Sequence, residues 1–183
     1  DKDWSFKRSY SVSEQNWTEI KFLIKYLETW RWSKILKNMS VWETINIIWP
    51  YWDFVLKDSE NKKIFIASWT WLSPIYNMIL NLKWEKTLIF WTRIEDDLFY
   101  IENLKKIPNL TTNIFLSRAE KLPENTENIK YFKRIEWETL MKENIITNDK
   151  NTEFYICWNA LLKESLTDFL TKNWYNNIYS EEF

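Results

Sequence analysis

The sequence contains no glycine and no histidine, and its 183 residues include a single cysteine, Cys157. Without histidine, the chain lacks the commonest metal ligand and the side chain that most often acts as a base near neutral pH. One cysteine cannot form a disulfide within the chain, a cysteine-rich zinc site or an iron–sulfur cluster. Any redox chemistry therefore requires an organic cofactor.

A surplus of charge of one sign is also missing, because 25 basic side chains balance 26 acidic ones. This balance gives no electrostatic basis for binding nucleic acid or an anionic membrane. The charge-free stretch 64–82 is long enough for a membrane span, but Ser68, Pro74 and Asn77 interrupt it, so we interpret it as core. No signal peptide is evident at the N-terminus, which predicts a cytoplasmic protein.

Tryptophan is abundant where glycine would be expected. The chain has 14 tryptophans, whereas ordinary usage would place about 13 glycines in a chain of this length. Trp17 and Trp174 each follow an asparagine at a predicted turn, and Trp69 and Trp71 lie between a strand pattern and a helix pattern. We hypothesise that the gene uses UGA as a glycine codon and that the sequence was translated with UGA as tryptophan. The alternative is a tryptophan-rich protein whose indoles form a core or a sugar-stacking face.

The chain divides near residue 58 into a β segment and an α/β segment. Short strands are predicted at 10–13, 19–27 and 44–48. After a polar linker at 57–63, strands predicted at 64–68, 87–91, 113–117 and 153–157 alternate with helices at 73–82, 96–106 and 160–172, with a surface loop at 120–130. This alternation is typical of a parallel sheet covered by helices.

With tryptophan read as glycine, two ordered sets of motifs resemble the ferredoxin–NADP reductase family. Its flavin domain is matched by Arg8-Ser9-Tyr10-Ser11 and by residues 30–36 and 49–54, and its nucleotide domain by residues 69–74, 91–93 and 157–159. The resemblance implies a partial antiparallel FAD-binding barrel at 1–58, followed by a Rossmann-like NAD(P)-binding domain at 59–183. The resembled barrel has further strands before its Arg-x-Tyr-Ser strand. We therefore expect a truncated fragment that holds FAD poorly by itself.

The resemblance also assigns roles in the flavin domain. Arg8 offers a planar fork of donors to a pyrophosphate, Tyr10 an aromatic face to the isoalloxazine ring, and Ser11 a hydroxyl to the reactive flavin nitrogen, which makes Ser11 a candidate catalytic residue. Ser9 completes this motif, and Trp32 and Ser33 would lie against the FAD pyrophosphate. Without the other motifs, residues 8–11 would be interpreted as an ordinary edge strand.

Candidate contacts to a nicotinamide dinucleotide follow several of the parallel strands. The resemblance assigns Thr70 to the bound cofactors and Arg93 to a nucleotide phosphate. Ser117 and Arg118 end a strand where a hydroxyl and a guanidinium can grip a 2′-phosphate together, and Arg134 resembles a further basic contact. These residues favour NADP over NAD. An exposed arginine at 93 and a helix-face salt bridge at Arg118 are the alternatives.

The end of the fourth predicted parallel strand carries the second candidate catalytic residue, Cys157, with Trp158 and Asn159 as cofactor contacts. The resemblance places this cysteine beside the nicotinamide, although lone buried cysteines are usually core residues. Phe183 is a candidate flavin shield. We predict an FAD-dependent oxidoreductase that transfers electrons between NAD(P)H and a ferredoxin or flavodoxin. The alternatives are a non-catalytic tryptophan-rich binding module and an electron-transfer component of a larger oxidoreductase complex.

Overall fold

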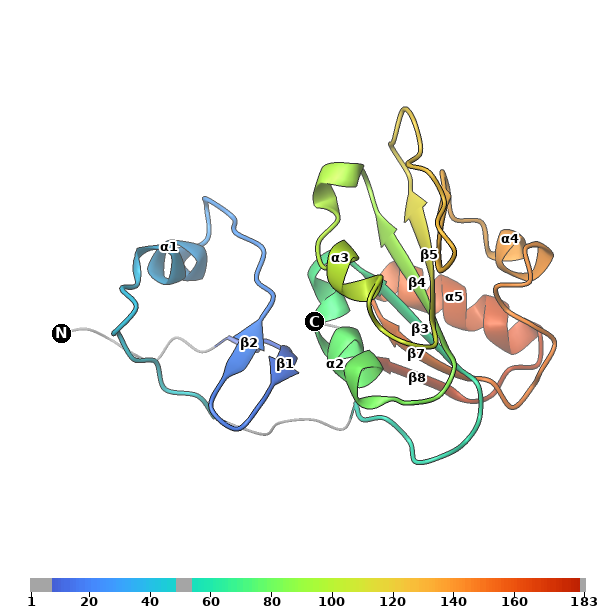
Figure 1. Cartoon of the computed structure of the whole chain (residues 1–183), viewed down its shortest axis with the longest axis horizontal. Coiled ribbons are helices and arrows are strands. Elements are labelled where there is room, and N and C mark those ends of the chain that lie inside the picture. The colour runs from blue at the N-terminus through green and yellow to red at the C-terminus, as the bar shows by residue number, and fades with distance from the viewer. Residues whose placement is uncertain (1–7, 49–53, 182–183) are drawn as a thin grey trace.

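The computed structural model, which describes residues 8–48 and 54–181, contains a two-stranded antiparallel sheet and a six-stranded parallel sheet (Figure 1). The antiparallel sheet pairs β1 (Val12–Gln15) with β2 (Ile20–Phe22), and helix α1 (Arg31–Asn38) follows it. The parallel sheet has the order β6-β5-β4-β3-β7-β8. Its strands are β3 (Lys63–Ser68), β4 (Lys86–Thr92), β5 (Leu110–Leu116), β6 (Ile129–Phe132), β7 (Glu153–Cys157) and β8 (Ile178–Glu181). The fold class predicted from the sequence is confirmed.

Helices cover both faces of the parallel sheet, because its central strands are apolar on both sides. Successive strand residues point to opposite faces, so Phe65 and Ala67 of β3 pack with α2 (Leu72–Asn81), whereas Ile64 and Ile66 pack with α5 (Ala160–Lys172). The short helices α3 (Ile101–Leu104) and α4 (Trp137–Lys142) add to the first and second of these layers, respectively. This arrangement is that of a parallel α/β sheet buried between helices.

Several elements differ from the sequence-based expectations. The strand predicted at 44–48 is wrong: these residues form no strand, and Ile45, Ile47 and Ile48 are exposed. Strand β6 begins inside the predicted surface loop 120–130. The helix predicted at 96–106 is split into the 3-10 turn η2 (Glu95–Asp97) and α3, because Tyr100 has a left-handed backbone with φ 61°.

The β1–β2 hairpin lies beside α2 (Figure 1). The Ser73 hydroxyl in the first turn of α2 donates a hydrogen bond of 2.7 Å to the Ser11 carbonyl. At the hairpin turn, the Asn16 side-chain oxygen accepts from the backbone N–H groups of Thr18 and Glu19, which explains the tight turn there. Ser11 is thereby fixed next to the start of α2, although the two residues are 62 positions apart.

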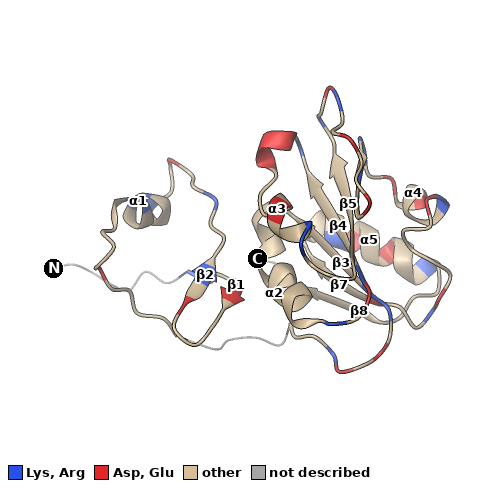
Figure 2. Cartoon of the chain, in the orientation of Figure 1, with Lys and Arg blue, Asp and Glu red and all other residues tan. Residues whose placement is uncertain are grey.

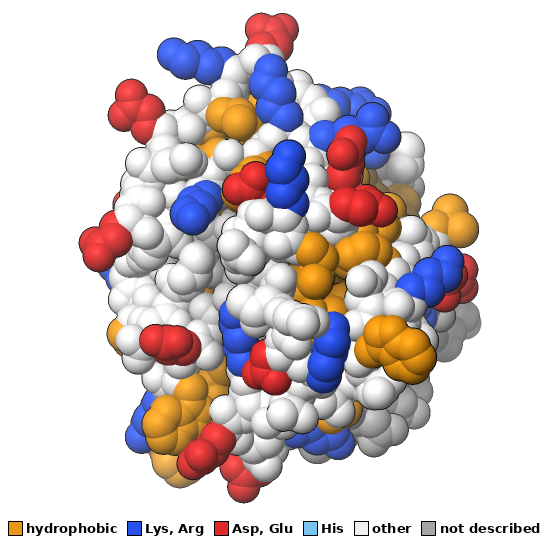
Figure 3. Space-filling model, turned by 90° about the vertical axis from the view of Figure 1, so that its right-hand side faces the viewer, with side chains coloured by type: hydrophobic (Ala, Val, Ile, Leu, Met, Phe, Trp, Pro, Cys, Tyr) orange, Lys and Arg blue, Asp and Glu red, His pale blue; other side chains and the backbone are white. Residues whose placement is uncertain are grey.

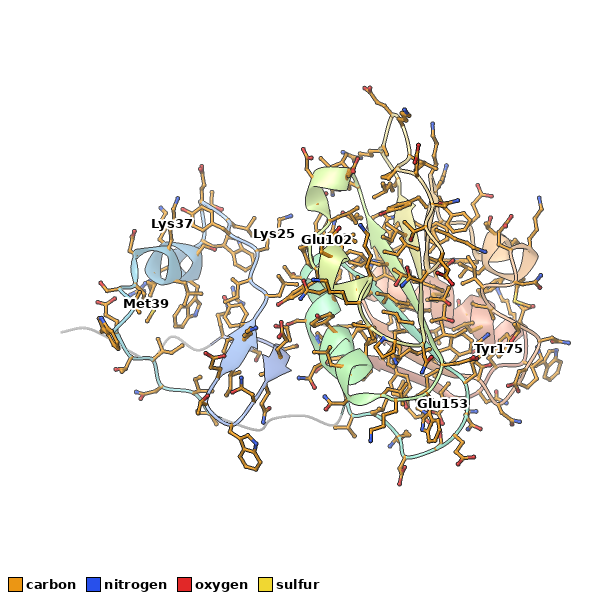
Figure 4. All side chains as sticks on the ribbon, viewed as in Figure 1. Lys25, Lys37, Met39, Glu102, Glu153 and Tyr175 are labelled. Atoms are coloured by element: carbon orange, nitrogen blue, oxygen red, sulfur yellow. The ribbon has the colours of Figure 1, made fainter. Side chains whose placement is uncertain are left out.

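A buried ion pair fastens residues 57–63 to the amino end of the parallel sheet. The Lys63 ammonium lies 3.3 Å from a Glu153 carboxylate oxygen, and both side chains are almost fully buried. Lys63 also donates to the Ser59 carbonyl at 2.8 Å, and the Tyr155 hydroxyl donates to Glu153 at 2.9 Å. The same hydroxyl accepts from the Lys57 backbone N–H. Figure 4 shows Glu153 at the edge of the sheet where the strands begin.

Candidate functional site

The order of the strands creates a topological switch point at the carboxyl edge of the parallel sheet. From β3 the chain moves outward through β4, β5 and β6, and it then returns to place β7 on the other side of β3. The loops that follow β3 and β7 therefore diverge, and in open parallel sheets ligands bind at such a switch point. Residues 68–72, 92–93, 117–118 and 158–159 all follow strands at this edge.

The basic and hydroxyl residues predicted to hold phosphate come together at this edge. The Ser117 backbone N–H donates to the Thr92 carbonyl at 3.1 Å, and the Arg118 N–H donates to the Arg93 carbonyl at 2.8 Å. Both arginines are exposed and Ser117 is half-buried. Arg134 lies two residues beyond Phe132, the β6 residue paired with Phe115, so its backbone lies at the same edge. The structure therefore places the backbones of these residues along one edge of the sheet.

The loop after β3 is filled by the Trp69 indole. Trp69 has a left-handed backbone with φ 47°, and its indole nitrogen donates to the Thr92 hydroxyl at 2.9 Å. The Lys25 ammonium lies 3.8 Å and the Arg93 guanidinium carbon 4.7 Å from the centre of the Trp69 ring. Figure 4 shows Lys25 in the segment that follows β2, on the side that faces the α/β layers.

This geometry decides how well a dinucleotide fits. Arg93, Ser117 and Arg118 offer the donors that a phosphate requires. The loop itself does not offer a cradle, because a phosphate is held there by main-chain N–H groups and needs a residue without a bulky side chain. The Trp69 ring takes that space, and the predicted contact Thr70 is half-buried beside it. A dinucleotide diphosphate therefore does not fit this loop while residue 69 is tryptophan.

Cys157 lies at the end of β7, fully buried, and its register partner in β8 is Glu181. Burial, with a smaller contribution from the Glu181 charge, raises the pKa of the Cys157 thiol. The thiol is thus protonated at neutral pH and is not a nucleophile. Burial raises the pKa of Glu181 to about 6. Glu181 was not predicted as a site residue, although its place in the acidic terminal strand was a usable signal. The predicted flavin shield, Phe183, lies outside the described residues.

The raised pKa of Glu181 predicts a pH dependence of stability. Burial disfavours the charged form of Glu181, so this carboxyl group contributes most to stability below its ordinary pKa of 4.5. The contribution is lost as the pH rises through about 6. Glu181→Gln should therefore gain stability relative to the parent between those values. Urea unfolding at a series of pH values measures this, with Glu164→Gln on the exposed side of α5 as the control. An equal gain at every pH would contradict the assignment.

The flavin-side residues are only partly brought together. The Arg8 guanidinium carbon lies 5.0 Å from the centre of the Trp30 ring, so Arg8 is beside the start of α1. Ser33 is buried, and its hydroxyl accepts from the Leu27 N–H at 3.0 Å. A shallow hollow of about 360 Å³ adjoins it, lined by Ile24, Tyr26, Ser33, Leu36 and Lys37.

The other predicted flavin-side residues do not line this hollow. Ser9 is exposed and Trp32 half-buried, and Tyr10 packs edge-on against Phe22 with the ring centres 6.4 Å apart.

Two predicted contacts at the end of β7 have structural roles. Trp158 is fully buried, its ring centre 5.6 Å from Trp91 and 6.1 Å from Trp137. Its indole nitrogen has no hydrogen-bond partner among residues 8–48 and 54–181. The Asn159 side-chain oxygen caps α5 by accepting from the Leu162 N–H at 3.2 Å. With tryptophan at 158, neither the indole nor the capping oxygen is presented to a ligand.

Three further indoles occupy surroundings that suit glycine better than tryptophan. Trp17 and Trp42 are almost fully exposed, and Trp174 is 77% exposed. Trp174 also has a left-handed backbone, with φ 66°, directly after α5. Glycine is the usual residue at that position of a helix end, because it has no Cβ to clash. These features support the glycine-codon hypothesis, which stays a prediction.

Trp174→Gly is expected to raise the free energy of unfolding by about 1 kcal/mol, because it relieves a bulky residue held at positive φ. Trp17→Gly is the matched control: its indole is also exposed, but its backbone is not left-handed. The control should be neutral or slightly destabilising, since glycine adds freedom to the unfolded chain. Thermal and urea unfolding compare the two. Stabilisation by both variants, or by neither, would contradict the backbone explanation.

Charge is mixed over the surface of the protein. Figure 2 shows Lys and Arg side chains interspersed with Asp and Glu, apart from the acidic turn η2. Figure 3 shows the face on the side of α4, where both signs alternate with small hydrophobic areas. Within the described ranges, no helix is both long enough and apolar enough to span a bilayer.

Comparison with known proteins supports the predicted resemblance. No protein-family model matches the chain. A curated relative, which is one component of the Na⁺-translocating NADH-quinone reductase of Neisseria meningitidis strain FAM18, is 23% identical over 150 residues. The match includes 75% of this chain but only 36% of the relative, so the chain spans about a third of that protein's length.

The fold is shared with solved reductases. The ferredoxin–NADP⁺ reductase of Neisseria gonorrhoeae with bound FAD and NADP gives a TM-score of 0.66 at 16% identity, covering 96% of this chain and 79% of the other. The Plasmodium falciparum enzyme with 2′P-AMP gives 0.63 at 22% identity, covering 96% and 76%. The chain thus has the fold of ferredoxin–NADP⁺ reductases, as the ordered motifs predicted.

Proposed function

We propose that this chain is part of a cytoplasmic flavin-dependent oxidoreductase that transfers electrons between NAD(P)H and a one-electron carrier such as a ferredoxin or flavodoxin. The observation that carries the proposal is the carboxyl edge of the sheet, where the backbones of Arg93, Ser117 and Arg118 lie together at the ends of β4 and β5, beside the switch point between β3 and β7. The hairpin that bears Ser11 is fixed to this edge through Ser73. Residues 1–58 would serve the flavin and residues 59–183 the nicotinamide nucleotide.

We assign the proposed function to the protein with glycine at position 69, because a tryptophan side chain at this position prevents a diphosphate from binding. When bound, the nicotinamide supplies a hydride and the flavin converts the electron pair into single electrons. The protein's task is to hold and align the two rings. Arg8 and Ser33 would bind the FAD pyrophosphate, with Tyr10 and Ser11 at the flavin ring. The fully buried Cys157, whose thiol stays protonated, would pack inside the sheet at the nicotinamide end and would not react.

NADP is proposed as the preferred nucleotide, with NAD as the alternative. Ser117 and Arg118 are neighbours at the end of β5, so a hydroxyl and a guanidinium could contact one phosphate together. Arg134 follows the neighbouring strand β6. A 2′-phosphate distinguishes NADP from NAD, and the similarly folded Plasmodium reductase was solved with 2′P-AMP. The arginines at the ends of β5 and β6 are therefore expected to determine whether the protein prefers NADP or NAD.

A second candidate function is supported by the curated relatives. The aligned proteins are components of Na⁺-translocating NADH-quinone reductases, so this chain could be the electron-transfer part of a larger complex. In that case its nucleotide would be NADH and its electron carrier another protein of the complex. The preference between NADPH and NADH separates the two candidates.

The test uses the chain with glycine at all fourteen tryptophan positions and measures NADPH and NADH binding by calorimetry. We expect binding of NADPH in preference to NADH, and Arg118→Ala should remove most of that preference. Lys172→Ala, at the opposite end of the sheet on α5, is the control and should leave it unchanged. A preference for NADH would favour the component of a larger complex. A folded glycine chain that binds neither nucleotide would refute both candidates.

A further inference from the structure

We propose that the Trp69 indole is an internal occupant of the crevice between Lys25 and Arg93, and that it excludes the diphosphate of a dinucleotide from the protein with tryptophan at this position. The inference rests on the proposed function, because that function identifies the ligand. It goes further by assigning the obstruction to one side chain. It also assigns Lys25, which lies outside the parallel-sheet domain, to the wall of the site.

Three contacts hold the indole in the crevice. Its nitrogen donates to the Thr92 hydroxyl at 2.9 Å, which anchors one edge of the ring at the end of β4. The Lys25 ammonium is 3.8 Å from the ring centre and the Arg93 guanidinium carbon is 4.7 Å from it. A cation over an indole face is attracted by the ring quadrupole. The ring thus takes the contacts of two cations and one hydroxyl that a phosphate group would use.

The charge around the ring indicates what it displaces. Neither Lys25 nor Arg93 forms an ion pair with a carboxylate in the part of the chain that the structure describes. Two cations close to the same ring repel each other, and the aromatic face offsets this repulsion only weakly. A diphosphate would offset it far better, because it presents negative oxygens to both cations at once. The chemistry of the crevice, without the indole, is that of an anion site.

The backbone at residue 69 supports the same conclusion. Ser68 is extended, with φ −136°, whereas Trp69 is left-handed, with φ 47°. A bulky residue adopts this conformation only at an energetic cost, and glycine adopts it freely. Trp69→Gly therefore keeps the turn between β3 and α2 while it removes the ring. The substitution opens the crevice without requiring the loop to refold.

The experiment compares the parent chain, Trp69→Gly and the matched control Trp174→Gly, which relieves the same backbone conformation far along the chain, after α5. Calorimetric titration with NADPH and with inorganic pyrophosphate measures binding, and thermal unfolding confirms that each variant is folded. Trp69→Gly should bind both probes at least about tenfold more tightly than the parent, because two charge-assisted contacts are released. Trp174→Gly should bind them as the parent does. Adding Lys25→Ala to Trp69→Gly should weaken pyrophosphate binding severalfold.

The outcomes separate this inference from the proposed function. A parent chain that binds NADPH as tightly as Trp69→Gly would overturn the obstruction and leave the function standing. A folded Trp69→Gly that binds pyrophosphate but not NADPH would support the obstruction and count against the function. If folded Trp69→Gly binds neither probe more tightly than the parent, the crevice is not an anion site and the inference is wrong.

Discussion

Replacing Glu153 with alanine is expected to lower the free energy of unfolding by about 3–5 kcal/mol, because it leaves the Lys63 ammonium buried without its counter-ion. The Lys63 side chain is only 1% exposed and that of Glu153 4%. The loss also removes the acceptor of the Tyr155 hydroxyl and of Ser59. Residues 57–63 would then be held to the sheet by fewer contacts. Urea unfolding followed by circular dichroism measures the change.

The exposed pair Glu102–Lys105 provides the control. Its atoms approach to 2.6 Å, closer than those of the buried pair, but the two side chains are 74% and 37% exposed. Glu102→Ala should therefore change stability by about 0.5 kcal/mol or less. Comparable losses from both alanine variants would show that burial does not determine the importance of the Glu153 pair.

The same carboxylate predicts a loss of stability in acid. Burial acts to raise the pKa of Glu153, but hydrogen bonds from Ser59, Tyr155 and Asn61, together with the Lys63 charge, outweigh it and hold the pKa below its ordinary value. The stability that this group contributes is therefore present above the ordinary pKa of 4.5 and is lost as the pH falls through the lower folded value. The free energy of unfolding of Glu153→Ala should therefore not show this loss in acid.

Replacing Trp158 with alanine is expected to cost about 3–5 kcal/mol, because it leaves a cavity between the sheet and α4. The ring is fully buried against Trp91 and Trp137. Its indole nitrogen has no partner in the described part of the chain. Removing this unpaired buried polar group recovers part of the lost stability, so the expected cost lies nearer to about 3 kcal/mol than to about 5 kcal/mol. Thermal unfolding with circular dichroism detection measures the change.

Trp42→Ala is the control for the buried indole, because Trp42 is 92% exposed. It should alter stability by no more than about 0.5 kcal/mol. The three packed indoles should also be coupled: after Trp158→Ala, loss of Trp91 should cost less than it does in the parent. Additive losses, or a Trp158→Ala variant as stable as the parent, would show that these rings do not form the packed cluster described here.

The parallel sheet was predictable because most of its strands have a distinctive local sequence. Residues 64–68 and 153–157 are short apolar runs bounded by polar residues, and such runs are typical of strands buried on both faces. Residues 44–48 carry the same kind of apolar residues but have no neighbouring strand within the described ranges, so their pattern alone was misleading. Strand β6 was not predicted, because the polar residues before it resemble a loop. Its formation depends on pairing with β5, which the local sequence does not indicate.

The site was predictable only where strand ends specify it. Parallel strands end at one edge, so residues that follow neighbouring strands lie together there, as the backbones of Arg93, Ser117 and Arg118 do. Lys25 was not predictable, because its approach to Trp69 depends on how the hairpin lies against the α/β layers. The surroundings of Trp158 were not predictable either. Its burial depends on two other indoles from different elements, and single positions in a sequence carry no signal for that.

Tryptophan occupies positions 69 and 71, where we propose that a bound diphosphate requires main chain without a bulky side chain. Peptide mass spectrometry of the protein isolated from the cells that make it, read across residues 63–83, tests this most directly. We expect this peptide to carry glycine at positions 69 and 71. Tryptophan at both positions in the native protein would contradict it, because the indole beside Thr92 would then be the natural occupant of the crevice.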